Sequence, residues 1–315
     1  MCFSVLNRAR RERVLMTGSR RLLRVSWAMT AVAGLVAALC LWTSPIAQAF
    51  YVQNHAAITR NALPPDQVSE AGMLQILNGP PPGGGAMGSD AFATDQWRHL
   101  DNAKNPTDIC ARAQQAWNIF SPVVLDGSQP VGPGATVLKN GPAARAAFGG
   151  LVHAQQDFYA HSNWVEDNIA AGQPDRLAPA IFPTCNPGDF PADLHTGYFN
   201  MLYSQQFPLD GCPPAGPPPG YQECHSQMNK DGPDTARGSQ PAPGAGTMYD
   251  LAASLATTAT TDLYNQLRGL VASTVSAKNP GVDGECVAAK LFHPDLLGPC
   301  ATFSNPFGQF GTAPR

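Results

Sequence analysis

One short stretch of the sequence, HAQQDFYAHSNW at positions 153–164, carries two histidines and an aspartate at four-residue intervals. In a helix, His153, Asp157 and His161 fall on nearly the same side, because residues four apart are turned by about 40° and displaced by about 6 Å. Imidazole nitrogen and carboxylate oxygen are both ligands of zinc. The spacing therefore predicts a metal-facing stripe.

The same spacing limits how this stripe could bind metal. His153 and Asp157 are near enough for one ion, but His153 and His161 lie about 12 Å apart on a straight helix. Metal bonds of roughly 2.0–2.2 Å cannot join both histidines to one ion. Either the site holds several ions, or the helix breaks near Ala160. The alternative without metal is a buried, aromatic-rich helix with a few polar bonds.

Other histidines extend the candidate site. The chain has seven histidines, and all except His293 lie in polar or aromatic surroundings that could serve one site. A lone histidine is most often a surface residue or a hydrogen-bonded core residue, but several with carboxylates nearby favour a shared centre. The candidates outside the stripe are His55, His99, His195 and His225.

The first 49 residues predict an export signal. Seven arginines precede an uncharged run from Trp27 to Trp42, and SPIAQAF then suits cleavage after Ala49. The run is shorter than the roughly 17–25 residues that span a bilayer, so a retained amino-terminal anchor is the weaker alternative. SRRLLR at 19–24 resembles a twin-arginine export motif. We therefore expect a secreted or cell-envelope protein.

Residues 50–315 would then form the mature chain, 266 residues long, which is enough for one domain with a sizeable core. It keeps 13 of the 20 basic residues and 22 of the 23 acidic ones, a formal charge of −9. Such a surface does not attract nucleic acid or an anionic membrane by net charge.

Six cysteines remain after residue 49, and an even number in an exported protein predicts three disulfides. Six cysteines allow 15 pairings. Cys286 with Cys300 and Cys212 with Cys224 are the favoured pairs, because each closes a short loop that contains proline or glycine. No CxxC pair is present, which argues against zinc held by cysteine.

The remaining pattern predicts an all-α domain whose helices are separated by long loops rich in proline and glycine. The best-supported helix covers 142–171, because proline stands at its first position and glycine follows its end. A second long helix is expected from Thr247 to about Ala272, where leucine and alanine recur at three- and four-residue spacing. Shorter helices are expected at 55–63, 67–77 and 109–120, loops at 172–195 and 205–245, and a loop-rich tail at 273–315.

Two further stretches resemble a known superfamily. FYVQNHAAITRNAL follows the expected cleavage point, and DQWRHLDNAKNPTDIC occupies 95–110. Both look like the zinc-dependent phospholipases C and fungal single-strand-specific nucleases. The resemblance implies that Phe50 binds zinc through its free amino group and carbonyl, and that His55 and His99 are ligands. His153 and Asp157 match the helical HxxxD pair of that superfamily.

Other motifs are closer to one branch. DFYAHSNW is followed by LHTGYF (194–199), CHSQMNKD (224–231) and a helix with LAASLATTAT. Together these resemble the Het-C-like proteins, named for a fungal heterokaryon-incompatibility protein, and their bacterial and von Willebrand A domain-containing relatives. The resemblance covers about residues 50–272.

The sequence departs from the enzyme pattern in three places. Three residues separate Asp157 from His161, where the phospholipases and nucleases have five. For the early carboxylate ligand, Asp90 in MGSDAF is favoured over Asp95. The closing HxxxE or HxxxD pair is not clearly present, and its candidates are His195, His225, Asp231 and Asp250.

A complete site implies hydrolysis of phosphodiesters. Two or three zinc ions would lower the pKa of a bound water toward neutrality and clamp the phosphodiester, while Asp90 or Asp157 orients the water. Exposed apolar surface around the cleft would favour phospholipid and transient contact with a membrane surface. Stacking aromatics such as Phe158, Tyr159 and Trp164 would instead favour nucleic acid.

Two other hypotheses stay open. One is a Het-C-like interaction protein of the cell envelope that keeps the fold and at most one metal ion but has no catalysis. The other is a disulfide-stabilised structural protein whose histidines bind nothing.

Overall fold

Helix α7 (Gly141–His161) runs through the middle of the residues that the computed structural model describes, which are 52–92, 94–200 and 212–301. It starts at Asn140, whose side chain accepts a hydrogen bond from the Ala143 amide, and proline follows in its first turn. Every residue from 144 to 161 is buried. A helix that is buried on all sides needs neighbours all round it.

Two adjacent glycines let those neighbours approach α7 closely. A Cβ atom at Gly149 would lie 1.9 Å from the carbonyl oxygen of Ile76, and one at Gly150 would lie 2.6 Å from the ring of Phe120. Any larger residue at either position would push the adjoining helix away.

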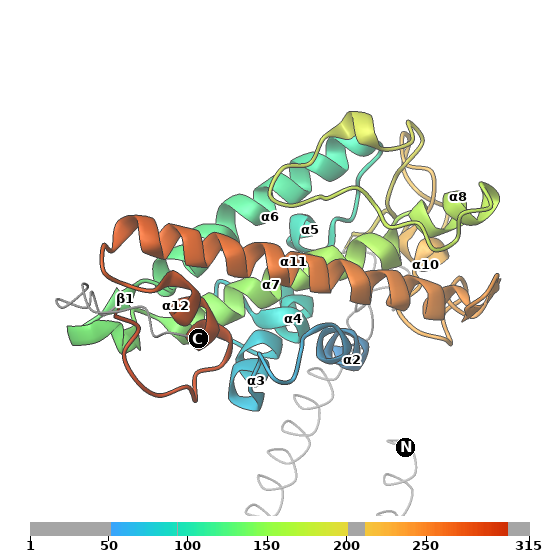
Figure 1. Ribbon diagram of the computed structural model, residues 1–315. Coiled ribbons are helices and arrows are strands. Elements are labelled where there is room, and N and C mark those ends of the chain that lie inside the picture. The colour runs from blue at the N-terminus through green and yellow to red at the C-terminus, as the bar shows by residue number, and fades with distance from the viewer. Residues whose placement is uncertain (1–51, 93, 201–211, 302–315) are drawn as a thin grey trace, which may run out of the picture. The chain divides into compact units, whose positions relative to one another are not determined.

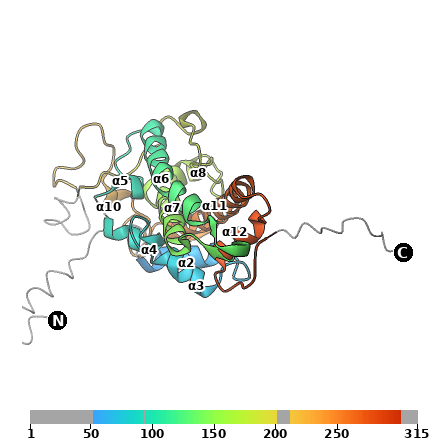
Figure 2. The ribbon, with the colours of Figure 1, turned by 90° about the vertical axis from the view of Figure 1, so that its left-hand side faces the viewer.

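Helices from both ends of the described chain surround α7 (Figures 1 and 2). Its largest contacts are with α6 on one side and α11 on another, while α3 and α4 pack near its middle. The long helices are α6 (Pro106–Gly127) and α11 (Met248–Lys278), and the shorter ones are α2 (Val52–Ala62), α3 (Glu70–Leu77), α4 (Gly85–Gly88), α5 (Gln96–His99), α8 (Trp164–Ala170), α10 (His225–Met228) and α12 (Gly284–Phe292).

The described strands are very short and form two antiparallel pairs. β1 (Pro130–Val131) pairs with β2 (Val137–Leu138), and β3 (Pro241–Ala242) pairs with β4 (Gly246–Thr247). Three single 3-10 turns complete the elements: η2 (Ser89–Phe92), η3 (Pro133–Ala135) and η4 (Pro187–Asp189). The prediction of a mostly helical fold with long loops is confirmed.

The helix predicted at 142–171 is in fact two helices. α7 continues through Ala160 and ends at His161, so the break falls just after the stripe and does not bring His153 and His161 to one ion. Ser162 then turns to extended geometry and pairs with Thr196 in an isolated bridge, before α8 begins at Trp164. Long-range pairing at Ser162 overrides the helical periodicity, which runs unbroken through the sequence.

The other helix predictions differ mainly at their ends. α6 starts at Pro106 and lasts to Gly127, which is longer than the predicted 109–120. α11 reaches Lys278, and α12 follows it. The tail after residue 272 was predicted to be rich in loops but contains this helix, which Asp283 caps by accepting hydrogen bonds from two backbone amides.

Three disulfides connect the loops to the helices. The predicted pairs Cys212–Cys224 and Cys286–Cys300 are confirmed. The third joins Cys110 on α6 to Cys185 in the loop that follows α8. The predicted export signal, its predicted cleavage site and Phe50 lie outside the described residues. Within the described part of the chain, no helix is both long and apolar enough to cross a membrane.

Candidate metal centre

Five buried side chains from four elements meet beside the middle of α7, and we call them the first cluster. Each is at most 5% exposed, so water cannot satisfy their polar atoms. α7 contributes the two central members, and the others come from α2, η2 and α5. The members are His55, Asp90, His99, His153 and Asp157.

Three ligand atoms in this cluster form an almost regular triangle. The Nε2 atom of His153 and the Nδ1 atom of His99 are each 3.0 Å from the Oδ2 atom of Asp157, and 3.0 Å from each other. Ligands around a tetrahedral zinc ion with bonds of 2.0–2.1 Å are separated by about 3.3–3.4 Å. The three atoms are therefore within about 0.4 Å of the spacing that zinc requires.

The other oxygen of Asp157 faces a different histidine. Its Oδ1 atom is 3.3 Å from the Nε2 atom of His55, on the opposite branch of the carboxylate from His99 and His153. A carboxylate whose two oxygens face separate groups of nitrogens can bridge two metal ions.

Partners outside the cluster direct the ring nitrogens. The Nδ1 atom of His153 is 2.8 Å from the Ala86 carbonyl oxygen, which can only accept a hydrogen bond. Burial lowers the pKa of His153 to about 4, so the ring is neutral and its single proton lies on Nδ1. The Nε2 lone pair is therefore left to face the cluster, as in a histidine that binds metal.

Gln156 orients His55 in the same way. Its side-chain nitrogen donates to the hydroxyls of Thr59 and Thr260, at 3.0 and 3.3 Å, so its oxygen is turned toward His55. The Nδ1 atom of His55 lies 2.7 Å from that oxygen and donates to it. The Nε2 atom of His55 is thus directed at Asp157.

Four further buried side chains form the second cluster at the carboxyl end of α7. The ring of His161 lies between two carboxylates: its Nδ1 atom is 3.1 Å from Asp101 and its Nε2 atom is 3.0 Å from Asp231. The Nε2 atom of His225 is 3.1 Å from the Nε2 atom of His161 and 3.9 Å from Asp101. His153 and His161 therefore belong to different clusters on one unbroken helix.

A tight turn after α5 connects the two clusters. Leu100 and Asn102 both have left-handed backbone conformations, with φ of 55° and 60°, on either side of Asp101. Because of this turn, the His99 side chain lies in the first cluster and the Asp101 side chain lies in the second. Asn102 fixes it by bonding both the amide and the carbonyl of Phe199, so the structure offsets the backbone strain with long-range hydrogen bonds.

Lys230 brings the segment after α10 to the end of α7. Its backbone amide donates to the Ala160 carbonyl, and its buried ammonium group donates to the Ser162 carbonyl and to Glu166. The next residue is Asp231, whose carbonyl also accepts from Asn54 on α2. These contacts place the Asp231 carboxylate beside His161.

Electrostatics link the charges in both clusters. Burial alone lowers the pKa of His55, but the charges of Asp157 and Asp90 outweigh it and raise the pKa to about 9. Burial likewise opposes the effect of Asp101 and Asp231 on His161, yet these carboxylates hold its pKa well above the usual range. Without metal, protonated histidines would therefore balance the buried carboxylates.

Asp90 is the carboxylate in the first cluster that has no hydrogen-bond partner for either oxygen among the described residues. It is 2% exposed. Burial raises its pKa to about 7. Its Oδ1 atom lies 3.8 Å from the Nε2 atom of His153. A buried carboxylate with two open oxygens beside a directed histidine fits a bound cation.

The structure brings most of the predicted site residues together. The early carboxylate is Asp90 rather than Asp95, which pairs with Arg98. Phe50 lies outside the described residues. His195 lies in neither cluster, and its Nδ1 atom is 2.8 Å from the Asp193 carbonyl oxygen.

Two carboxylates complete the second cluster. Asp231 was one of four candidates for the closing ligands, whereas Asp250 caps α11 instead. Asp101 was not among the predicted site residues, although it stands two residues after His99. Its only sequence signal is that nearness to a predicted ligand.

Comparison with known proteins relates one part of the chain to a family. A family model described as the VWA7 N-terminal domain matches residues 134–181. These residues include all of α7 and α8, and so the three site residues of the helical stripe. No curated protein and no solved structure matches the chain. The similarity to this family therefore concerns the central helix and its surroundings.

Proposed function

We propose that this protein holds zinc in the two clusters and hydrolyses phosphodiesters with a metal-activated water. The observation that carries the proposal is the arrangement around Asp157, whose oxygens face His55 on one branch and His99 with His153 on the other. The open oxygens of Asp90 give independent support.

The chemistry of the donor atoms favours zinc over other ions. Both clusters offer imidazole nitrogens and carboxylate oxygens in mixed sets, whereas calcium and magnesium prefer oxygen alone. Thiolate sites are not available, because all six cysteines among the described residues form disulfides.

The tautomer of His153 limits how many ions the first cluster can hold. Its Nδ1 atom is used by Ala86, so it can bind one ion only, through Nε2. That ion would share Asp90, His99 and one oxygen of Asp157. A second ion would take His55 and the other Asp157 oxygen, and it would need a further donor, for which the predicted amino group of Phe50 is the candidate.

The second cluster would hold one more ion with Asp101, His161 and His225, which gives up to three in all. When bound, such ions supply a water of lowered pKa and positive charge for the phosphodiester oxygens. The chain's own groups would position that chemistry: Asp90 orients the water through its open oxygens, and Asp157 holds the histidines on both sides of it.

The structure removes one argument about the substrate. Phe158, Tyr159 and Trp164 are completely buried in the core, so the expectation that they stack on nucleic-acid bases is wrong. The exposed large apolar side chains include Val131 and Val137 in the hairpin that precedes α7, far along the chain from both clusters. The proposal is therefore for a phosphodiester, with phospholipid and nucleic acid both to be assayed.

Deep burial favours a second candidate function. No residue of either cluster is more than 5% exposed. A metal held this deeply can stabilise a fold without reaching a substrate. The alternative is a non-catalytic interaction protein of the cell envelope that uses the metal only for stability.

One experiment separates these functions. Protein exported with its native amino terminus is analysed by elemental mass spectrometry, and its turnover of bis-p-nitrophenyl phosphate is measured with and without added zinc. Two or three zinc ions with turnover support the hydrolase. Bound zinc without turnover of this substrate, phospholipid or single-stranded nucleic acid supports the structural role. Absence of zinc contradicts both.

A further inference from the structure

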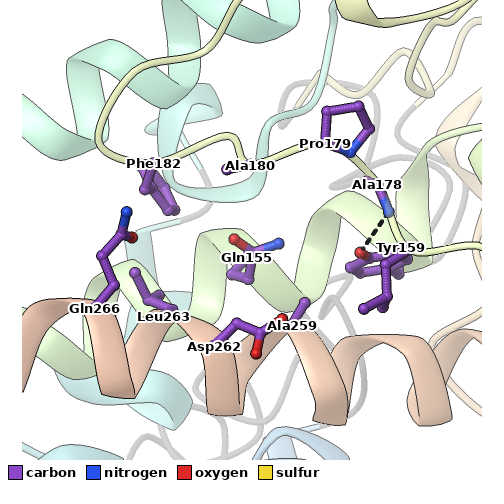
Figure 3. Close-up of a pocket in the computed structure, with 11 residues that line it drawn as sticks. Gln155, Tyr159, Ala178, Pro179, Ala180, Phe182, Ala259, Asp262, Leu263 and Gln266 are labelled. Carbon is purple, nitrogen blue, oxygen red and sulfur yellow. Dashed lines mark hydrogen bonds between the residues drawn. The ribbon is translucent and has the colours of Figure 1, made fainter.

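A separate cavity of about 230 Å³ lies against the other side of α7 (Figure 3). Its walls come from α7, from the proline-containing loop at 177–182 and from α11. Gln155 and Tyr159 belong to its α7 wall, and each is turned by about 160° from its cluster neighbours two positions away. The cavity and the metal centre therefore use opposite faces of the same helix.

Gln155 is the buried polar group in this cavity. Its side chain is 7% exposed, and it forms no hydrogen bond with any described residue. Figure 3 shows its amide turned into the space between the loop and α11. Its amide atoms are open to the cavity and have no partner among the described residues, so they are free to hydrogen-bond a ligand that enters it.

Tyr159 and Asp262 add two more polar groups. The Tyr159 hydroxyl accepts a hydrogen bond from the Ala178 amide at 3.1 Å, which ties the loop to α7, and its buried side chain forms part of the wall. Asp262 stands on α11 and forms no ion pair with the described residues. Among the described residues, no lysine, arginine or histidine lines the cavity, and Asp262 is the only charged one that does.

The remaining wall is mostly apolar and narrow. Leucine, proline, alanine and phenylalanine side chains, among them Phe182 and Leu263, line the cavity beside the polar groups, and Gln266 on α11 adds a second amide. Ligand pockets for drug-sized molecules measure roughly 300–1,000 Å³, so this cavity suits a smaller molecule. An uncompensated carboxylate excludes anions, and the aromatic face adds affinity for cations.

We propose that this cavity is a binding site for a small organic cation, an ammonium or guanidinium group on a short alkyl body. Asp262 and the Gln155 oxygen receive the cationic head, and the apolar wall encloses the alkyl body. The cation is either a free amine or the side chain of a basic residue in a partner. The site is separate from the candidate metal centre, because its α7 residues lie on the opposite face of that helix.

The test compares three probes of matched shape by isothermal titration calorimetry on the full exported chain: n-butylammonium, n-butanol and butyrate. We expect n-butylammonium to bind, n-butanol to bind about tenfold more weakly, and butyrate not to bind, because a charge-assisted hydrogen bond is worth roughly tenfold or more in affinity. A capped tripeptide with a central lysine distinguishes a side chain of a partner from a free amine.

Two variants and a control locate the site. Asp262→Asn removes charge from an exposed position and should weaken n-butylammonium about tenfold, and Gln155→Leu should weaken it by a similar factor. Asp66→Asn removes the same charge from an exposed loop outside the cavity and should change nothing. Equal binding of the three probes, no binding of n-butylammonium, or equal affinity in Asp262→Asn and Asp66→Asn would overturn the proposal.

Discussion

Replacing Asp157 with asparagine tests the metal centre where its contacts are most numerous. The variant keeps the shape of the side chain but loses its charge and one of its two oxygens. Those oxygens lie 3.3 Å from His55 and 3.0 Å from both His99 and His153. Each ion of the first cluster would lose a ligand, whereas the second cluster has no direct contact with Asp157. We expect bound zinc to fall to the single ion of the second cluster.

The expected change in stability has two parts that must be separated. Asp157 is completely buried, and burial by itself raises the pKa of its carboxyl group. The surrounding histidines have the larger, opposite effect and hold this pKa well below the usual range. Breaking such a network costs about 3–5 kcal/mol even without metal. Zinc at a hundred times its Kd adds about 2.7 kcal/mol per site, or roughly 5–10 °C in Tm for a domain of this size.

The assay therefore compares the rise in Tm when zinc is added to metal-free protein, rather than Tm itself. Asp175→Asn is the matched control, because Asp175 is exposed and forms no ion pair or hydrogen bond with the described residues. We expect the control variant to show the same rise in Tm as the wild type. The rise in Tm for Asp157→Asn should be smaller by at least 5 °C. If Asp157→Asn keeps both the wild-type rise and the wild-type zinc count, Asp157 is not a ligand and the bridging argument fails.

Three more predictions follow from single contacts. Gln156→Leu removes a partner that directs a ligating ring, so zinc affinity should fall about 10–100-fold in a competition titration, and an unchanged affinity would contradict that role. Joint replacement of Cys110 and Cys185 by alanine opens a loop of 75 residues and should cost about 4 kcal/mol in urea unfolding, more than opening the 12-residue loop of the second disulfide. Gly149→Ala should lower Tm strongly, whereas Gly269→Ala on α11, where an added Cβ meets nothing within 4 Å, should leave it unchanged or raise it.

Local sequence patterns predicted helices well where apolar and polar residues repeat with the helical period. The stripe of α7, the leucine repeat of α11 and the short disulfide loops each depend on residues close together in the chain. The errors arose where distant segments meet. Ser162 leaves the helix because Thr196 pairs with it, and no residue near position 162 carries that information.

The candidate metal centre shows the same division between what local sequence and distant segments determine. The sequence alone determined that His153, Asp157 and His161 face one side of a helix, because helical geometry depends only on spacing. It also determined that His153 and His161 are too far apart for one ion. Only the tertiary structure showed that the helix is unbroken from His153 to His161, while other segments bring further histidines and carboxylates to its middle and to its carboxyl end.

Tertiary packing also decided which carboxylates join which histidines. Asp101 and Asp231 stand 130 positions apart and meet only at the ring of His161. A left-handed turn places the first, and the contacts of Lys230 with the end of α7 place the second. Neither aspartate has a local signature in the sequence. The position of its carboxylate and the burial that keeps water away from it both depend on how the whole chain packs.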